Sequence, residues 1–170
     1  AGEKGQYWNT RADDLIVKAM IGLLERNPGL PKERVDDVAI AATTQQGDQG
    51  LTLGRTAAIL AGLPLSVPGY AIDRMCAGAM TSVTTIAGAI AFGAYDVGIA
   101  GGVEHMGRHP MGFNADPNPR FLAEKLVSAD ALNMGITAER LHDRFPGLTK
   151  ERSDRFGMRS QQKVAAAYEA

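Results

Sequence analysis

The sequence has little cysteine, few aromatic residues and almost no net charge. Its 170 residues include one cysteine and 6% aromatic residues, and 18 Lys plus Arg stand against 19 Asp plus Glu, for a formal net charge of -1. One cysteine excludes an internal disulfide and a thiolate zinc site, and it favours a reducing compartment. The near balance of charge removes the long-range attraction that binders of nucleic acid or anionic membranes use. We therefore expect a cytoplasmic protein with no nucleic-acid partner.

Long apolar runs are missing as well. The sequence has no stretch of about 18 uncharged apolar residues, the length that a membrane-spanning helix needs, so we expect no membrane span. It does not open on a basic segment followed by an apolar one, which a secretory signal requires. Residues 1–5 are typical of a loop, and residues 165–170 stop within a helical pattern. We expect the chain to be an excerpt of a longer polypeptide.

What is present is an alternation of strand and helix patterns. The run 38–43 is short, apolar and bounded by polar residues, as in a parallel strand that is covered on both faces. A helix pattern at 51–60 follows, then an extended segment at 69–73, a helix of small apolar residues at 76–93 and an apolar strand at 96–102 that ends in a double glycine. The helix at 76–93 is apolar on all faces and is expected to be buried. This order predicts an α/β fold with a mostly parallel sheet.

Helical patterns also lie near the two ends of the chain. Thr10 followed by two acidic residues is typical of a helix start. The predicted buried face of that helix consists of Leu15, Ile16, Ala19, Leu23 and Leu24. After Met106 a stretch rich in proline, glycine and asparagine predicts a long surface excursion, and such excursions are often functional. Helices are expected again at 137–144 and from Thr149 to the end.

The most informative position is Cys76, which lies where the predicted strand passes into the helix of small residues. The free N–H groups and the dipole of a helix N-terminus favour a charged, nucleophilic thiolate. Free cysteine is also among the most buried residue types and commonly acts as a small hydrophobe. The local pattern alone therefore leaves two interpretations of Cys76, a nucleophile and a core residue.

Four segments resemble, in order and spacing, motifs of the thiolase family. Residues 73–79 resemble its Asn-x-x-Cys-small-Ser-Gly nucleophile motif, and residues 100–106 resemble its Gly-Gly-x-Glu-x-Met signature. Residues 133–139 resemble the Met-Gly-x-Thr-Ala-Glu element of the family's loop domain, and residues 159–162 before an alanine-rich helix are similar as well. The resemblance runs from about Gly5 to the last residue and is more specific than any single short motif.

The resemblance implies a fold and an activity. It implies a thiolase-like, mostly parallel sheet sandwiched by helices, with residues 1–106 as the N-terminal core and residues 107–170 as a loop-domain insertion after the core. It implies an acetyl-CoA C-acyltransferase that cleaves 3-ketoacyl-CoA with CoA to acetyl-CoA and a shortened acyl-CoA. Residues 104–107 followed by Pro110-Met111 look like the degradative fatty-acid β-oxidation branch. Coenzyme A is then a substrate, and no cofactor is expected.

The resemblance also implies roles for two residues and a set of partners. Cys76 is expected to be the catalytic nucleophile that carries the acyl group. Met134 matches a methionine that lines the acyl and pantetheine end of the thiolase pocket, while a core methionine on a helix is the alternative. Acyl-CoA and CoA are the expected small-molecule partners. A homodimer or tetramer is expected, with a β-oxidation complex as a further partner.

The chain departs from the family pattern in several places. Asp73 stands where the family has Asn, and Ala77-Gly78-Ala79 stands where it has small-Ser-Gly. Three elements of the family's C-terminal half do not occur in the sequence: Asn-Glu-Ala-Phe, Gly-His-Pro and a second cysteine in Cys-x-Gly. The family's first core strand, which precedes Gly5, is missing as well. The family assigns proton transfer and enolate stabilisation to those missing elements. We therefore expect the 170-residue segment alone to be inactive.

The histidines do not predict a metal site. His105 and His109 lie in a segment rich in glycine and proline that does not present both rings on one helix face, and His142 is remote in sequence. For His105 we expect a structural hydrogen bond. Two alternatives to a thiolase stay open: a condensing ketoacyl synthase, which lacks the element at 134–139, and a noncatalytic assembly module, which the small-residue helix also suits.

Overall fold

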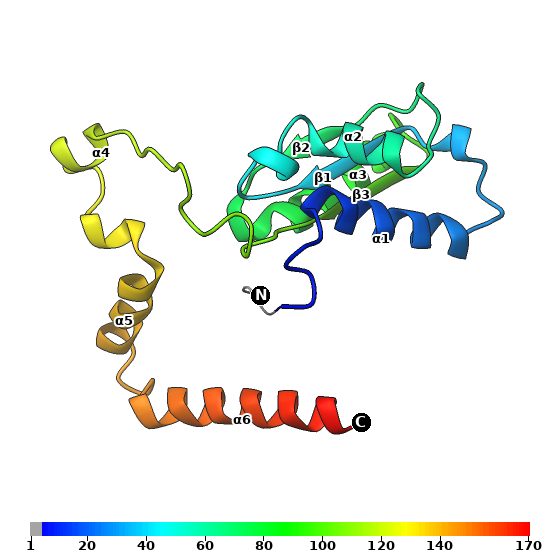
Figure 1. Cartoon of the computed structure of the whole chain (residues 1–170). Helices are drawn as coiled ribbons and strands as arrows, with labels where there is room; N and C mark the ends of the chain where they lie inside the picture. Colours follow the sequence, from blue (N-terminus) through cyan, green and yellow to red (C-terminus); the bar gives the residue numbers. More distant parts are fainter. Residues whose placement is uncertain (1–4) are drawn as a thin grey trace. The chain divides into compact units, whose positions relative to one another are not determined.

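A computed structural model of the chain describes residues 5–170 and contains a parallel sheet with helices on both faces (Figure 1). The chain forms two compact units, one ending at Ala115 and the other beginning at Asp116. The first unit contains α1 (Ala12–Arg26), β1 (Asp37–Ala41), α2 (Leu53–Leu60), β2 (Tyr70–Ile72), α3 (Gly78–Ala91) and β3 (Gly98–Gly102). The second contains α4 (Arg120–Ala123), α5 (Met134–Arg144) and α6 (Lys150–Glu169).

The sheet has three strands in the order β2-β1-β3, and both neighbours run parallel to β1. The central strand β1 is buried at all five positions, as the apolar run at 38–43 predicts. The expected strands at 69–73 and 96–102 are confirmed as β2 and β3, although only Ile99 of β3 is buried. The sequence prediction of an α/β fold with a parallel sheet is therefore correct.

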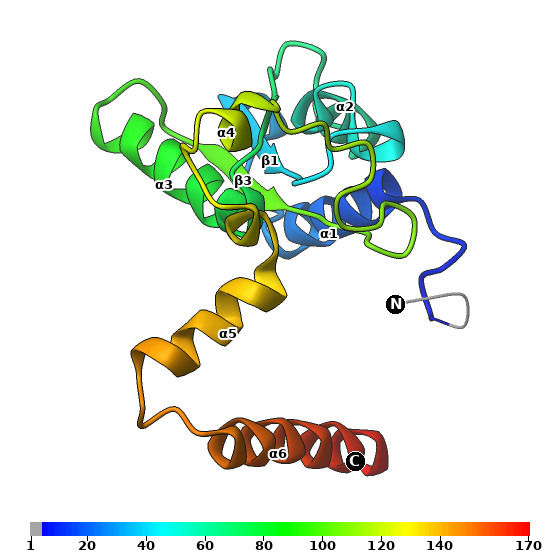
Figure 2. The ribbon, with the colours of Figure 1, turned by 90° about the vertical axis from the view of Figure 1, so that its left-hand side faces the viewer.

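The two crossover helices lie on opposite faces of the sheet. The chain passes from β1 through α2 to the neighbour on one side, and from β2 through α3 to the neighbour on the other side. Crossovers between parallel strands are almost always right-handed, so two steps in opposite directions put their helices on opposite faces. Figure 2 shows α3 on one side of the strands and α1 and α2 on the other.

The main core lies between the sheet and the pair α1 and α2. Val38 and Ile40 project from β1 into this core and are at most 1% exposed. The helices contribute the following buried residues: Ile16, Val17 and Met20 from α1, and Leu53, Ala57 and Ala58 from α2. Burial of this apolar cluster stabilises the first unit by about 25 cal/mol for each Å² of apolar surface removed from water.

The predicted buried face of α1 is wrong in part. Ile16 is buried, but Ala19 and Leu23 are exposed, and Leu15 and Leu24 are only partly covered. The buried face instead consists of Ala12, Ile16, Val17 and Met20. Apolar residues occupy two adjacent stripes of this helix, and contact with α2 selects the stripe that contains Met20.

The expectation that α3 is buried on all faces is also wrong. Only Gly78, Ser82 and Ile86 are buried, on the one face that packs against the sheet. Met80, Val83, Ile90 and Phe92 on and after this helix are exposed. A uniformly apolar sequence cannot tell one face from another, so the position of the sheet alone decides which residues are covered.

Close contacts between helices and sheet occur at glycines. A Cβ at Gly54 of α2 would lie 2.1 Å from the carbonyl oxygen of Tyr70 and 2.5 Å from that of Val38. On the other face, a Cβ at Gly102 of β3 would lie 3.0 Å from the Ala79 Cβ and 3.0 Å from the Ala41 oxygen. The double glycine that ends β3 therefore reflects close packing of α3 at Gly102, and it is not a turn in the left-handed region.

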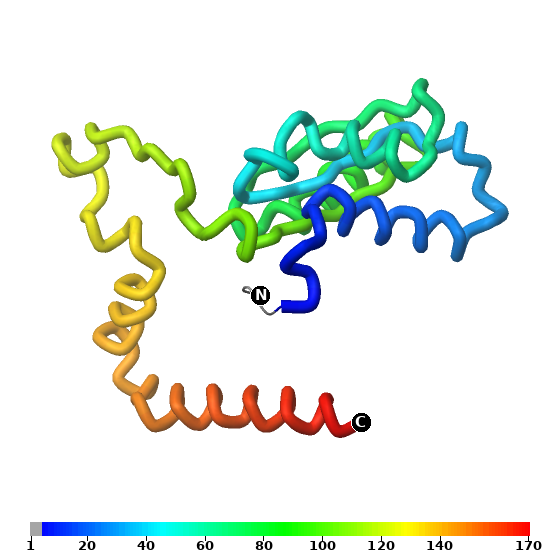
Figure 3. The backbone as a smooth tube through the Cα atoms, viewed as in Figure 1, coloured from blue at the N-terminus to red at the C-terminus, as the bar shows by residue number. Residues whose placement is uncertain are grey.

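The second unit contains turns and helices with no strand among residues 116–170 (yellow to red in Figure 3). The expected helices at 137–144 and from Thr149 are confirmed as α5 and α6. Each has a side-chain N-cap, because the Asn133 Oδ1 accepts from the Ile136 N–H and the Thr149 Oγ1 accepts from the Arg152 N–H. The stretch between Met106 and α5 is irregular except for α4 and a short 3-10 turn, as predicted.

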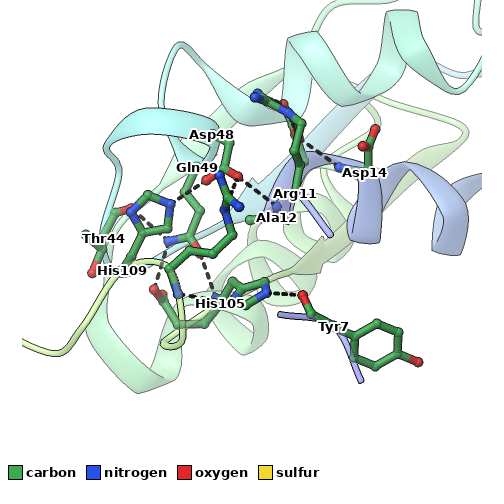
Figure 4. Close-up of polar contacts among 12 residues, drawn as sticks. Tyr7, Arg11, Ala12, Asp14, Thr44, Asp48, Gln49, His105 and His109 are labelled. Atoms are coloured by element: carbon green, nitrogen blue, oxygen red, sulfur yellow. Dashed lines mark hydrogen bonds and ion pairs between the residues drawn. The ribbon is translucent and has the colours of Figure 1, made fainter. Parts of the chain in front are cut away.

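A buried carboxylate fastens three segments of the first unit together (Figure 4). The Asp48 side chain is 3% exposed, and it accepts hydrogen bonds from the Ala12 N–H at the start of α1 (3.1 Å), from the Arg108 Nε (2.9 Å) and from the His109 Nε2. Burial raises the pKa of Asp48, but the bonds from His109 and Ala12 and the charge of Arg108 outweigh it, so this pKa lies below its ordinary value of 3.8. We call this group the Asp48 clamp.

The first prediction concerns Gly54. Gly54→Ala should lower the free energy of unfolding by about 3 kcal/mol, because a methyl group would push α2 away from the backbone of β1 and β2. Gly88→Ala is the matched control, since a Cβ there meets nothing within 4 Å and alanine is the better helix former by about 0.5–1 kcal/mol. Urea unfolding followed by circular dichroism measures both. Equal stability of the two variants would contradict the close contact.

The second prediction concerns the pH dependence of the Asp48 clamp. Asp48→Asn should lower the free energy of unfolding by about 2–4 kcal/mol at neutral pH. Because the pKa of Asp48 is depressed on folding, its contribution is fully present above 3.8 and is lost as the pH falls through the folded-state value. The free energies of unfolding of the wild type and the variant should therefore converge below pH 3.8. If their difference stayed constant as the pH falls, the charge of the Asp48 carboxylate would not be what holds the three segments together.

Candidate active site

The carboxyl ends of all three strands meet at one edge of the sheet. Ala41, the last residue of β1, is in register with Ile72 at the end of β2 and with Gly102 at the end of β3. Chain segments that leave this edge carry Thr43, Cys76 and Glu104, two to four residues beyond the strands. In open α/β sheets, ligand sites form outside this edge, at the point where connections turn to opposite faces. Here the connections that leave the neighbouring strands β1 and β2 turn to opposite faces, through α2 and α3.

Cys76 lies in a short 3-10 turn, Met75–Ala77, between β2 and α3. Its side chain is exposed, so the interpretation of Cys76 as a core residue is not supported in this chain. Met75 has φ of 48°, in the left-handed region that costs a non-glycine residue about 1–2 kcal/mol. The Asp73 Oδ1 accepts a hydrogen bond of 3.1 Å from the Met75 N–H and helps to hold this turn. Asp73 thus keeps an acceptor oxygen where the family pattern has Asn.

The turn that carries Cys76 is seated on the sheet through the first residues of α3. A Cβ at Gly78 would lie 2.8 Å from the Ala41 Cβ, and the Ala79 Cβ lies against Gly102. Ala41 and Gly102 are the last residues of β1 and β3, so no side chain larger than a methyl group separates α3 from these two strands here. The position of Cys76 therefore depends directly on how the ends of β1 and β3 are held.

A chain of hydrogen bonds joins those two strand ends. The fully buried Gln49 donates from its Nε2 to the Thr44 carbonyl oxygen and to the Glu104 Oε1, both at 2.8 Å. The Gln49 Oε1 accepts from the His105 N–H at 2.7 Å, and the Glu104 Oε2 accepts from the Thr43 N–H at 2.7 Å. We call this group the Gln49–Glu104 relay. It ties the exit of β1 to the exit of β3.

His105 has the structural hydrogen bonds that the sequence analysis expects. Its Nδ1 accepts from the Arg108 N–H at 3.2 Å, which leaves the proton on Nε2, and the Nε2 lies 2.8 Å from the Tyr7 carbonyl oxygen. Figure 4 shows the ring between Gln49 and Tyr7. His105 is 7% exposed and connects the N-terminal segment to the residues after β3.

The other predicted site residue, Met134, belongs to the second unit. It is the first residue of α5 and is 71% exposed. Cys76 and Met134 therefore lie in different units, and each is accessible on its own unit.

The histidines do not gather with other ligands. Within residues 5–170 there is no group of three or more His, Cys, Asp or Glu side chains that could hold a metal ion. His109 bonds Asp48, and the His142 Nδ1 lies 2.6 Å from the Leu148 carbonyl oxygen. In the described part of the chain no helix is long and apolar enough to cross a membrane.

Sequence reasoning missed Asp48 and Gln49. Both lie on a short polar loop that carries no motif, and their partners at 104, 105, 108 and 109 are more than 50 residues away. Among these partners, Glu104 and His105 lie in the segment 100–106 that resembles a family signature. The sequence did not predict the hydrogen bonds of Glu104.

Comparison with known proteins gives a consistent result. The family model described as "Thiolase, N-terminal domain" matches residues 1–170. A 3-ketoacyl-CoA thiolase of Saccharophagus degradans is 41% identical over 98% of this chain and 42% of the relative. The protein of the same name from Idiomarina loihiensis is 39% identical over 97% of the chain and 42% of the relative.

A further 3-ketoacyl-CoA thiolase, from Pseudoalteromonas translucida, is 41% identical over 96% of the chain and 41% of the relative. The chain thus spans about two fifths of the length of the curated relatives that it matches. The family match covers every residue, and the exposed Cys76 and Glu104 both follow carboxyl ends of the parallel strands. The chain belongs to the thiolase family, and it corresponds to the N-terminal domain.

Proposed function

We propose that this chain supplies the acyl-accepting cysteine of a 3-ketoacyl-CoA thiolase of the degradative type. The observation that carries the proposal is the exposed Cys76 in a strained turn between a strand end and the N-terminus of α3. An accessible thiol beside a helix N-terminus is a common arrangement for a cysteine nucleophile. The relatives named 3-ketoacyl-CoA thiolase support the same reaction class.

The proposed reaction has two steps. In the first, the Cys76 thiolate attacks C3 of the 3-ketoacyl-CoA, the bond between C2 and C3 breaks, and its electron pair leaves as the enolate of acetyl-CoA, which takes up a proton. In the second, the thiol of free CoA loses its proton and attacks the acyl group on Cys76, and the cysteine thiolate is released. The covalent intermediate divides one difficult carbon–carbon cleavage into two easier steps.

The residues of this chain account for part of that chemistry. Cys76 provides the nucleophile, and its backbone N–H is the proposed donor to the thioester oxygen. The proton donor and the donors to the enolate are assigned by resemblance to family elements that this sequence does not contain. We place Met134 of α5 at the acyl and pantetheine end of the substrate, within a loop domain of residues 107–170. A homodimer or tetramer of the complete protein is part of the same proposal.

The third prediction tests the nucleophile in the complete natural polypeptide. Incubation with a 3-ketoacyl-CoA and no free CoA should add one acyl mass to the peptide that contains Cys76, because the second step cannot proceed. Cys76→Ala should lower kcat by about four orders of magnitude or more, as loss of a covalent nucleophile does elsewhere. Later addition of CoA should remove the label. An acyl mass on another peptide, or full turnover by the variant, would refute the assignment.

The fourth prediction concerns the 170-residue chain by itself. Its thiolytic rate should be lower than that of the complete polypeptide by at least about four orders of magnitude, because oxyanion donors and acid–base groups each contribute about two to four. Loss of the 3-ketoacyl-CoA absorbance in the presence of CoA measures both proteins at equal concentration. Comparable rates would mean that residues within this chain complete the reaction.

A further inference from the structure

Glu104 occupies an unusual position for an exposed carboxylate. It leaves the end of β3 at the same edge as Cys76, and both of its oxygens are engaged by groups from the β1 side. One oxygen accepts from the Thr43 N–H at 2.7 Å and the other from the Gln49 Nε2 at 2.8 Å. Two donors from the segment that follows β1 therefore bind one side chain in the segment that follows β3.

The chemistry of Gln49 fixes the direction of these bonds. Its Oε1 accepts from a backbone N–H, that of His105, so its Nε2 must be the group that faces Glu104 and the Thr44 carbonyl. A side chain at position 104 must then accept twice and donate nothing. A carboxylate meets this requirement, whereas an amide satisfies only one of the two donors. Charge-assisted bonds are also about twice as strong as neutral ones.

The bonded strand ends are the surface on which the cysteine turn sits. Thr43 and Glu104 each lie two residues beyond Ala41 and Gly102, and the Ala42 N–H in turn bonds to the Ile72 carbonyl of β2. Ala41 and Gly102 contact the first residues of α3, Gly78 and Ala79. If the ends of β1 and β3 move apart, the N-terminus of α3, which lies beside Cys76, therefore moves as well.

We propose that Glu104 is a positioning residue for Cys76, acting through Gln49 and the ends of β1 and β3. It does not touch the substrate; it keeps the cysteine turn and the N-terminus of α3 in the geometry that attack requires. The reaction named here rests on the proposed function, but the placement of the thiol does not. Misplacement by about 1 Å costs up to a hundredfold in rate in well-oriented reactions, so a shift of the turn has a measurable effect.

The test compares three variants of the complete natural polypeptide. Glu104→Ala removes both bonds, Glu104→Gln keeps an acceptor for the Thr43 N–H, and Asp48→Asn is the control that disrupts the neighbouring Asp48 clamp but leaves the relay intact. The rate at which iodoacetamide alkylates Cys76, mapped by peptide mass and followed against pH, is measured without any acyl-CoA. Steady-state kinetics then give kcat and KM, and urea unfolding gives the stability of each variant.

Glu104→Ala should slow alkylation of Cys76 and lower kcat by about tenfold each, with KM within about twofold of wild type. Glu104→Gln should give rates between those of Glu104→Ala and the wild type, because the amide keeps the bond from the Thr43 N–H but loses the one from the Gln49 Nε2. Asp48→Asn should leave the alkylation rate within about twofold despite its loss of stability.

The positioning role would be overturned if Cys76 were alkylated in Glu104→Ala at the wild-type rate. It would also be overturned if Asp48→Asn slowed the alkylation of Cys76 as much as Glu104→Ala does. If no acyl group forms on Cys76, the proposed function fails, and the alkylation series still decides whether Glu104 positions the thiol.

Discussion

The central strand β1 is the constraint on which the rest of the first unit depends. It is buried at every position, and helices approach it from both faces so closely that only glycine or alanine fits at several contacts. Gly54 permits the approach of α2 on one face, and Gly78 permits that of α3 on the other. Because both neighbouring strands run parallel to β1 and in register with it, this packing also brings all three carboxyl ends to one level.

That level edge explains how residues far apart in sequence come to share a site. Cys76 follows β2, Gln49 lies on the loop after β1, and Glu104 follows β3. The cysteine turn rests on the two strand ends that the Gln49–Glu104 relay joins, so a buried amide and an exposed carboxylate determine where an exposed thiol lies. The Asp48 clamp beside it holds the start of α1 and the segment at 108–109 to the same loop.

Much of this architecture was predictable from local patterns. A few residues are enough to predict the buried run of β1 and the passage from strand to helix at Cys76. The local sequence does not predict the buried face of α1, because Leu15 and Leu23 form a second apolar stripe, and only packing against α2 favours the stripe with Met20. The Gln49–Glu104 relay could not be predicted from the sequence for another reason. Gln49 bonds residues 55 and 56 positions away, so no local spacing marks it as buried and fully hydrogen-bonded.

The central claim is that the edge formed by these strand ends presents Cys76 as the acyl acceptor. The most direct measurement is a crystal structure of the complete natural polypeptide after reaction with a 3-ketoacyl-CoA in the absence of CoA. The account predicts continuous density from the Cys76 Sγ to an acyl carbonyl carbon, with the Glu104 carboxylate still bonded to Thr43 and Gln49. Density for the acyl group on a different side chain, with an unmodified Cys76, would contradict it.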